Sequence, residues 1–197
     1  HIFAERERLQ SLTWEYFDVK QLSPTIGAEL VGLDLSQELT DEVVSEIQQA
    51  LWDYKVIFFR NQEITSEEQL RFAQRFGELE IHPFLPPNTE TPELVRFEEN
   101  ANAAGYENQW RHDVTWRETP SQGAILRAIE IPPIGGDTLF VDANAAYEGL
   151  TQEMKDEIDS LNAVHDFLRA FGRQVPKEKL AEMREMYPLV KHPVVIN

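Results

Sequence analysis

Residues 123–142 read GAILRAIEIPPIGGDTLFVD, and this stretch bears most directly on the fold class. Its first half, residues 123–131, alternates apolar and other side chains well enough to predict a strand, and residues 137–142 predict a second strand. The PPIGG sequence between them is typical of a turn. We therefore expect two successive strands here.

Helical patterns precede and follow this stretch. Residues 40–54 predict a helix because Thr40 can cap it and apolar residues recur at helical spacing. Residues 65–76 predict another, in which Thr65 and Glu68 have the spacing of a capping box. Helices interleaved with short strands are typical of an α+β or β-rich domain with helices on one side. The further expected elements are helices over residues 151–161 and 176–187, and strands over residues 27–36, over residues 55–60 and from residue 192.

The composition limits the class of protein. The chain has 197 residues, of which 42% are hydrophobic, and this fits one packed globular domain over residues 1–197. Residues 1–12 are expected to be an N-terminal extension or a cloning remnant, and residues 13–197 the domain itself. The lack of cysteine excludes disulfide bonds, thiolate metal sites and a cysteine nucleophile.

The charge is strongly negative, with 18 Lys and Arg against 35 Asp and Glu, which gives a formal net charge of −17. We expect no nucleic-acid partner, because phosphate binding needs a basic face. Small anionic substrates stay open, since a few local arginines can dominate within a Debye length of about 8 Å. No apolar stretch approaches the ~20 residues of a membrane span, and no signal-peptide pattern opens the chain, so we expect a cytoplasmic protein without a membrane partner.

His112 and Asp113 are the candidate metal ligands, within the WRHDVTW sequence of residues 110–116. Imidazole and carboxylate are the ligand types of non-haem Fe(II) sites that leave positions open for dioxygen and a co-substrate. Taken alone, the dipeptide fits better with an exposed loop histidine beside a turn aspartate. Trp110 and Trp116 are expected to pack and to stiffen this loop.

A set of motifs places the dipeptide in a wider pattern. They are WRHDVTW (110–116), ETP (118–120), GAIL (123–126) and GGDTL (135–139), with further matches at residues 27–36, 76–78, 82–83, 145–148, 165–167 and 192–195. On these motifs the chain resembles the taurine dioxygenase-like family of Fe(II)/2-oxoglutarate-dependent oxygenases, from about residue 22 onward. In that pattern His165 and His192 match structural positions.

The resemblance implies a β-rich α+β fold, namely a double-stranded β-helix (jelly roll) with flanking helices, and a homo-oligomer. It implies hydroxylation of a small substrate with Fe(II) and dioxygen, while the co-substrate 2-oxoglutarate is converted to succinate and CO2. Members of the family continue through further strands that carry a distant histidine ligand and an arginine for 2-oxoglutarate. The C-terminal part of the jelly roll is therefore expected to be missing from these residues.

The same resemblance implies roles for individual residues. Asp113 matches the carboxylate ligand, with His112 as its candidate partner, and Thr138 matches a hydroxyl that binds 2-oxoglutarate. Phe171 matches an aromatic wall of the substrate pocket, although it fits plain hydrophobic core equally well. The implied substrate-binding residues are His82, for an anionic head group, Leu85, Glu107 and Phe171.

Arg111 departs from the His-x-Asp pattern of the family, which needs a histidine at this position. Because alternate residues of an extended segment share a face, His112 and Asp113 can share one metal only across a tight turn or bulge. Leu85 and Glu107 replace a tyrosine and an asparagine of the taurine site, so another sulfonate, a sulfate ester or a carboxylate is expected. Two alternatives stay open: a degenerate member that binds metal weakly or not at all and acts as a non-catalytic binding protein, and a non-enzymatic acidic globule with incidental matches.

Overall fold

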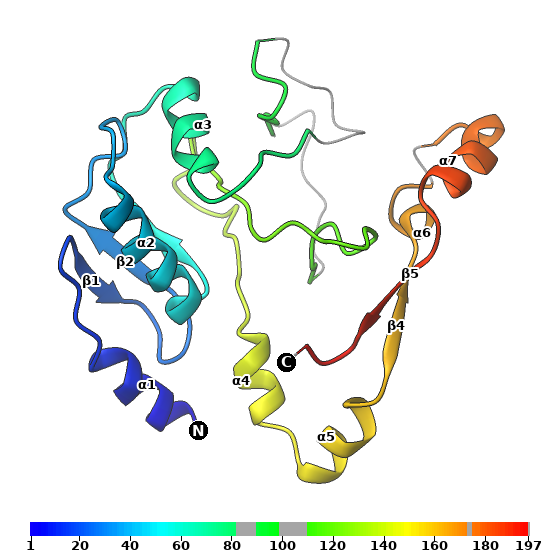
Figure 1. The fold of residues 1–197 in the computed structure, drawn as a ribbon, viewed down its shortest axis with the longest axis horizontal. Coiled ribbons are helices and arrows are strands. Elements are labelled where there is room, and N and C mark those ends of the chain that lie inside the picture. Colours follow the sequence, from blue (N-terminus) through cyan, green and yellow to red (C-terminus); the bar gives the residue numbers. More distant parts are fainter. Residues whose placement is uncertain (82–89, 99–109, 173–174, 197) are drawn as a thin grey trace. The chain divides into compact units, whose positions relative to one another are not determined.

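The computed structural model describes residues 1–81, 90–98, 110–172 and 175–196 (Figure 1). The chain divides into two compact units. Unit 1 comprises residues 1–98 and 127–149, and unit 2 comprises residues 99–126 and 150–197. The single domain expected over residues 1–197 stays a prediction.

Unit 1 is built on a small mixed sheet with the strand order β1-β2-β3. Strand β1 runs antiparallel to β2, whereas β3 runs parallel to β2 because helix α2 connects them as a crossover. Its elements are α1 (Ile2–Gln10), β1 (Asp18–Gln21), β2 (Ala28–Val31), α2 (Asp41–Tyr54), β3 (Ile57–Phe58), α3 (Ser66–Gln74) and α4 (Ala143–Glu148). The strands predicted over residues 27–36 and 55–60 are thus confirmed, in shorter form.

Local side-chain caps fix the starts of α2 and α3. The Thr40 hydroxyl accepts the Val43 N–H at 3.5 Å. At α3 the Thr65 hydroxyl accepts the Glu68 N–H at 3.2 Å, and the Glu68 carboxylate accepts the Thr65 N–H at 2.7 Å. Each cap satisfies amides that the helix leaves without an internal partner. Both predicted helices and the capping box are confirmed.

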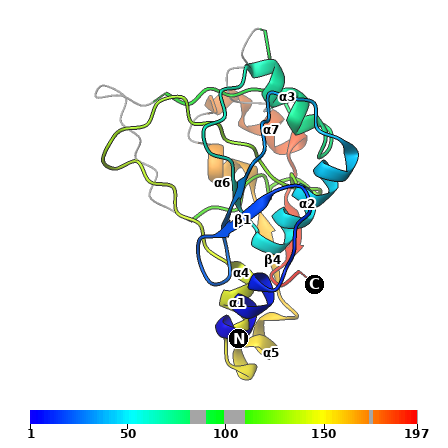
Figure 2. The same ribbon diagram turned by 90° about the vertical axis from the view of Figure 1, so that its left-hand side faces the viewer.

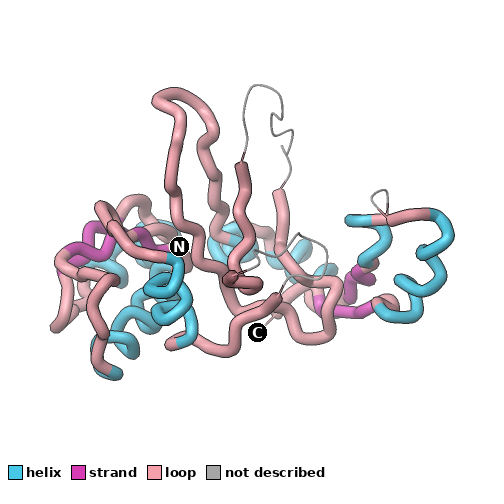
Figure 3. Tube along the Cα trace, turned by 90° about the horizontal axis from the view of Figure 1, so that it is seen from above, coloured by secondary structure: helices cyan, strands magenta, loops and turns pink. Residues whose placement is uncertain are grey.

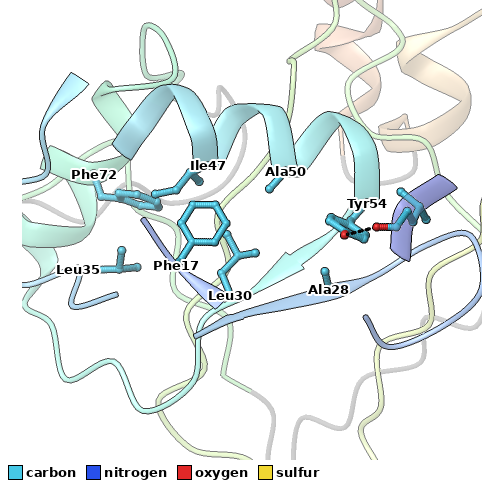
Figure 4. Packing of buried hydrophobic residues seen from close by; sticks show 9 residues of the cluster. Phe17, Ala28, Leu30, Leu35, Ile47, Ala50, Tyr54 and Phe72 are labelled. Carbon is cyan, nitrogen blue, oxygen red and sulfur yellow. Dashed lines mark hydrogen bonds between the residues drawn. The ribbon is translucent and has the colours of Figure 1, made fainter. Parts of the chain in front are cut away.

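The core of unit 1 lies between α2 and the sheet (Figure 4). Helix α1 joins this core, because Leu9 is only 1% exposed and its carbonyl accepts the Tyr54 hydroxyl at 3.2 Å. Arg8 of α1 also pairs with Asp53 of α2 at 2.7 Å. The buried core residues are Leu9, Phe17, Ala28, Leu30, Leu35, Ile47, Ala50, Tyr54 and Phe72.

The strands predicted over residues 123–131 and 137–142 are absent from the described structure, where these residues form a loop. The yellow-green trace that leads into α4 has no strand arrow in Figures 1 and 2, and Figure 3 draws it as loop. A strand needs a neighbouring strand to pair its backbone amides, and no strand pairs with this stretch in the described part of unit 1. Its apolar side chains stay exposed, with Ile129, Ile131 and Leu139 between 70% and 75%.

Unit 2 is built on a two-stranded antiparallel sheet of β4 and β5. The helix expected over residues 151–161 forms as the shorter α5, and Met154 and Leu161 are 43% and 47% exposed. Within the described ranges, every helix is too short or too polar for a bilayer crossing. The elements of unit 2 are α5 (Gln152–Ile158), β4 (Asn162–His165), α6 (Phe167–Phe171), the 3-10 helix η1 (Lys177–Lys179), α7 (Leu180–Met186) and β5 (Val190–Pro193).

The burial of Leu9 gives a test of how firmly α1 is held. We expect Leu9→Ala to lower the free energy of unfolding by about 2–5 kcal/mol, because it opens a cavity in the core of unit 1. Phe3→Ala is the matched control on the same helix, since Phe3 is 71% exposed, and we expect it to change the free energy by less than about 0.5 kcal/mol. Urea denaturation followed by circular dichroism measures both. Equal effects of the two variants would show that α1 does not contribute to the core.

Candidate functional site

The candidate metal ligands stand at the start of a tight turn in unit 2. Residues 113–116 form the turn, and the Arg117 N–H donates to the Val114 carbonyl at 3.1 Å. Val114 has a φ of +59°, a left-handed conformation that costs a β-branched residue about 1–3 kcal/mol. The turn thus begins at Asp113, directly after His112.

Two histidines of the β4–β5 sheet hold the far side of this turn. The His192 Nε2–H donates to the carbonyl oxygens of Thr115 and Arg117, each at 2.9 Å. His165 Nδ1 lies 2.8 Å from the Thr115 hydroxyl oxygen. The two imidazole centroids are 5.1 Å apart with an interplanar angle of 75°. Burial lowers the pKa of His165, and the nearby His192 and His112 lower it further, so the neutral form is favoured at pH 7.

Trp116 anchors the turn in a small aromatic cluster. Its ring is 7% exposed and lies 5.2 Å from Phe167 and 5.0 Å from Tyr187, edge to face in both cases. Phe171 stacks on the fully buried Phe167 at 5.1 Å, so it packs in the core of unit 2. The predicted packing role of Trp116 is confirmed. That of Trp110 is wrong, because its side chain is 67% exposed and lies outside this cluster.

His112 and Asp113 are both exposed, and a cation faces the carboxylate. Arg111 Nε lies 3.9 Å from Asp113 Oδ1, with side-chain exposures of 60% and 73%. An exposed pair of this kind adds little to stability. The pair places the positive charge of the Arg111 guanidinium beside the Asp113 carboxylate, which is the group that a metal ion would need.

Residues 18–197 match the family described as "Taurine catabolism dioxygenase TauD, TfdA family". The chain belongs to this family. The alkylsulfatase of Acinetobacter baylyi is 34% identical in an alignment of 190 residues that covers 92% of this chain and 59% of the relative. The alpha-ketoglutarate-dependent sulfate ester dioxygenase of Pseudomonas putida is 35% identical in an alignment of 187 residues that covers 90% of this chain and 61% of the relative.

A solved structure shows the same likeness. The crystal structure of a taurine dioxygenase from Burkholderia xenovorans superposes with a TM-score of 0.74 at 33% identity, and the match covers 92% of this chain and 59% of the other. The family expected from the motifs is therefore confirmed. The chain spans about three fifths of the length of these TauD/TfdA relatives.

The described residues do not by themselves fit the complete iron site that TauD/TfdA membership implies. His112 and Asp113 offer an imidazole and a carboxylate, both of the kind that Fe(II) takes. Among residues 1–81, 90–98, 110–172 and 175–196, no three His, Cys, Asp or Glu side chains come close enough to hold a metal ion. The guanidinium of Arg111 further opposes a cation at Asp113.

The other predicted site residues are distributed over the chain. Thr138 is exposed and belongs to unit 1, in the loop before α4. Phe171 belongs to unit 2, as do His112 and Asp113. The remaining predicted residues lie outside the described residues, and their roles stay predictions: His82, Leu85 and Glu107.

The contacts of His165 and His192 were not predicted from the sequence. The family pattern marks both as structural positions, but their shared target, residues 115–117, is about 50 residues or more away in the chain. Alternation within β4 and β5 is the signal that could have placed both side chains on one face.

Asp166 links the aromatic cluster to α7 and gives a pH-dependent test. Its carboxylate caps α6 by accepting the Leu168 N–H at 2.9 Å and accepts two bonds from Arg184, at 2.8 and 3.1 Å. The bonds from Arg184, followed by the Leu168 and Arg169 amides, hold the pKa of Asp166 below its usual range. A lowered folded pKa adds stability above the unfolded pKa of about 3.9, and this stability is lost as the pH falls through the folded value.

We expect Asp166→Asn, which keeps an acceptor for the cap, to lower the free energy of unfolding at pH 7 by about 0.5 kcal/mol, because the ion pair is partly exposed. The difference from wild type should shrink as the pH falls below about 4. Urea denaturation at pH 7, 5 and 3 measures it, with the exposed Glu182→Gln of α7 as the control. A difference that stays constant over this range would contradict the ion pair.

Proposed function

We propose that the protein is an Fe(II)- and 2-oxoglutarate-dependent dioxygenase that hydroxylates a small anionic substrate and releases succinate and CO2. The observation that carries this proposal is the identity with the alkylsulfatase and the sulfate ester dioxygenase over nine tenths of the chain. The turn that begins at Asp113 adds support, because adjacent ligands can share one metal only across a tight turn or bulge. We further propose a homo-oligomer in the cytoplasm, as the family resemblance and the composition favour.

A sulfate ester is the substrate class that we propose first. Leu85, in place of a tyrosine of the taurine site, suits an alkyl chain better than a compact polar substrate. His82 is the residue proposed to bind the anionic group. Since the net charge of the chain is −17, binding of an anion depends on such local groups and not on the overall field.

The double-stranded β-helix is likewise part of the proposal. The exposed apolar side chains of residues 123–142 support it, because the partner strands of a sheet would cover them. They include Ile129 and Ile131 in the first stretch, and Leu139, Phe140 and Val141 in the second. In a jelly roll both stretches would be strands of the sheets that enclose the site.

A degenerate, non-catalytic family member is the second candidate. The observation that favours it is the ion pair between Arg111 and Asp113, at 3.9 Å. A guanidinium beside a carboxylate disfavours a second cation at the same carboxylate. Such a protein would keep the fold and bind an anionic ligand without turnover.

Anaerobic addition of Fe(II) and 2-oxoglutarate separates the two candidates. The proposed dioxygenase should develop a weak visible charge-transfer band, and Asp113→Ala should abolish it, because the carboxylate ligand is lost. Glu118→Gln, an exposed neighbour of the turn, is the control and should leave the band unchanged. Absence of the band in the wild type, with its appearance in Arg111→His, would favour the degenerate member.

The substrate role of His82 has its own kinetic signature. We expect His82→Ala to raise the KM for an alkyl sulfate about tenfold or more, because a charge-assisted hydrogen bond to the anion is lost. Turnover of 2-oxoglutarate without substrate should change far less. Succinate formation measured with and without the alkyl sulfate gives both values. Equal losses in the two assays would exclude His82 from substrate binding.

A further inference from the structure

The β4–β5 sheet presents its two histidines on a single face. Ala163 pairs with His192 and His165 pairs with Val190 across the antiparallel strands. Because side chains alternate along a strand, these four residues share one face, and it is the half-buried face of both strands. The opposite face, which includes Lys191, is exposed. The turn of residues 113–116 lies against the histidine face through the contacts described above.

His192 bonds to the backbone of the turn and to no side chain in it. Its Nε2 lies 2.9 Å from the carbonyl oxygens of both Thr115 and Arg117. A carbonyl oxygen only accepts, so Nε2 carries the proton and is shared between the two acceptors. The His192 side chain therefore bonds to the carbonyls of Thr115 and Arg117, which are two residues apart in the chain. These bonds constrain the backbone path at the end of the turn.

His165 reaches the same turn by a second route. Its Nδ1 lies 2.8 Å from the Thr115 hydroxyl oxygen, which in turn lies 3.5 Å from the carbonyl oxygen of His112. The chain of contacts thus runs from β4 through Thr115 to the residue that carries the candidate imidazole ligand. The two histidines act on both ends of one short segment.

Backbone strain at Val114 calls for support from the surrounding structure. Val114 is in the left-handed region, which a β-branched residue keeps only when its surroundings enforce it. The neighbouring Trp116 is buried, so the far side of the turn is already anchored in the aromatic cluster. His112 and Asp113 precede this anchored residue, and both are exposed.

We propose that His192 and His165 are positioning residues that hold the turn and thereby set the directions in which His112 and Asp113 point. The consequence for metal binding rests on the proposed function. The effect on the turn itself does not, and the two can therefore be measured separately.

The first measurement is metal-independent. In His192→Leu, hydrogen exchange of the Arg117 backbone amide, which closes the turn onto the Val114 carbonyl, should become about tenfold faster, as expected for the loss of two hydrogen bonds. In His192→Gln the exchange should stay close to wild type, because an amide NH2 can donate to both carbonyls. Lys191→Leu, on the exposed face of β5, is the control. Unchanged exchange in a folded His192→Leu would overturn the proposal.

The second measurement is the affinity for Mn(II), followed by electron paramagnetic resonance. We expect His192→Leu to bind Mn(II) about tenfold more weakly and His192→Gln to restore the affinity. If the wild type binds no Mn(II), the proposed function fails. The hydrogen-exchange result still shows whether His192 holds the turn. If His192→Leu does not fold, Thr115→Val takes its place. It replaces the Thr115 hydroxyl with a methyl group, and it should speed Arg117 exchange several-fold, while unchanged exchange would overturn the role of His165.

Discussion

The hydrogen bonds from His192 to the carbonyls of Thr115 and Arg117 are the constraint on which unit 2 depends. They join the β4–β5 sheet to a turn that local sequence does not favour, because Val114 sits in a left-handed conformation. The burial of Trp116 against Phe167 then ties the same turn to α6 and α7. A segment of a few residues is thereby held from two directions, and its exposed end carries the candidate ligands.

Sequence predicted those elements whose causes are local. Helices α2 and α3 follow from caps within three residues of Thr40 and Thr65, so a short window contains all the information needed. The strands expected in residues 123–142 depend on partners elsewhere in the chain, and without such pairing the stretch is loop. Likewise, helix α5 forms where expected, but the periodicity of its sequence does not predict which tertiary contacts cover its apolar side chains.

The candidate site divides along the same line. The juxtaposition of Arg111 and Asp113 could be expected, because alternate residues of an extended segment share a side. The contacts of His165 and His192 could not, because they depend on the register of β4 with β5 and on a turn far away in the sequence. Residue type alone does not predict burial here. Trp110 and Trp116 belong to one motif, yet Trp110 is 67% exposed and Trp116 is 7% exposed.

Membership of the TauD/TfdA family and competence to bind iron are separable properties of this chain. The first is a matter of scaffold, distributed over residues 18–197, and no single substitution removes it. The second depends on charge within a few ångströms of one carboxylate, where a guanidinium at 3.9 Å offsets what Asp113 offers a cation. Both candidate functions keep the same scaffold, and the residue that distinguishes them is Arg111.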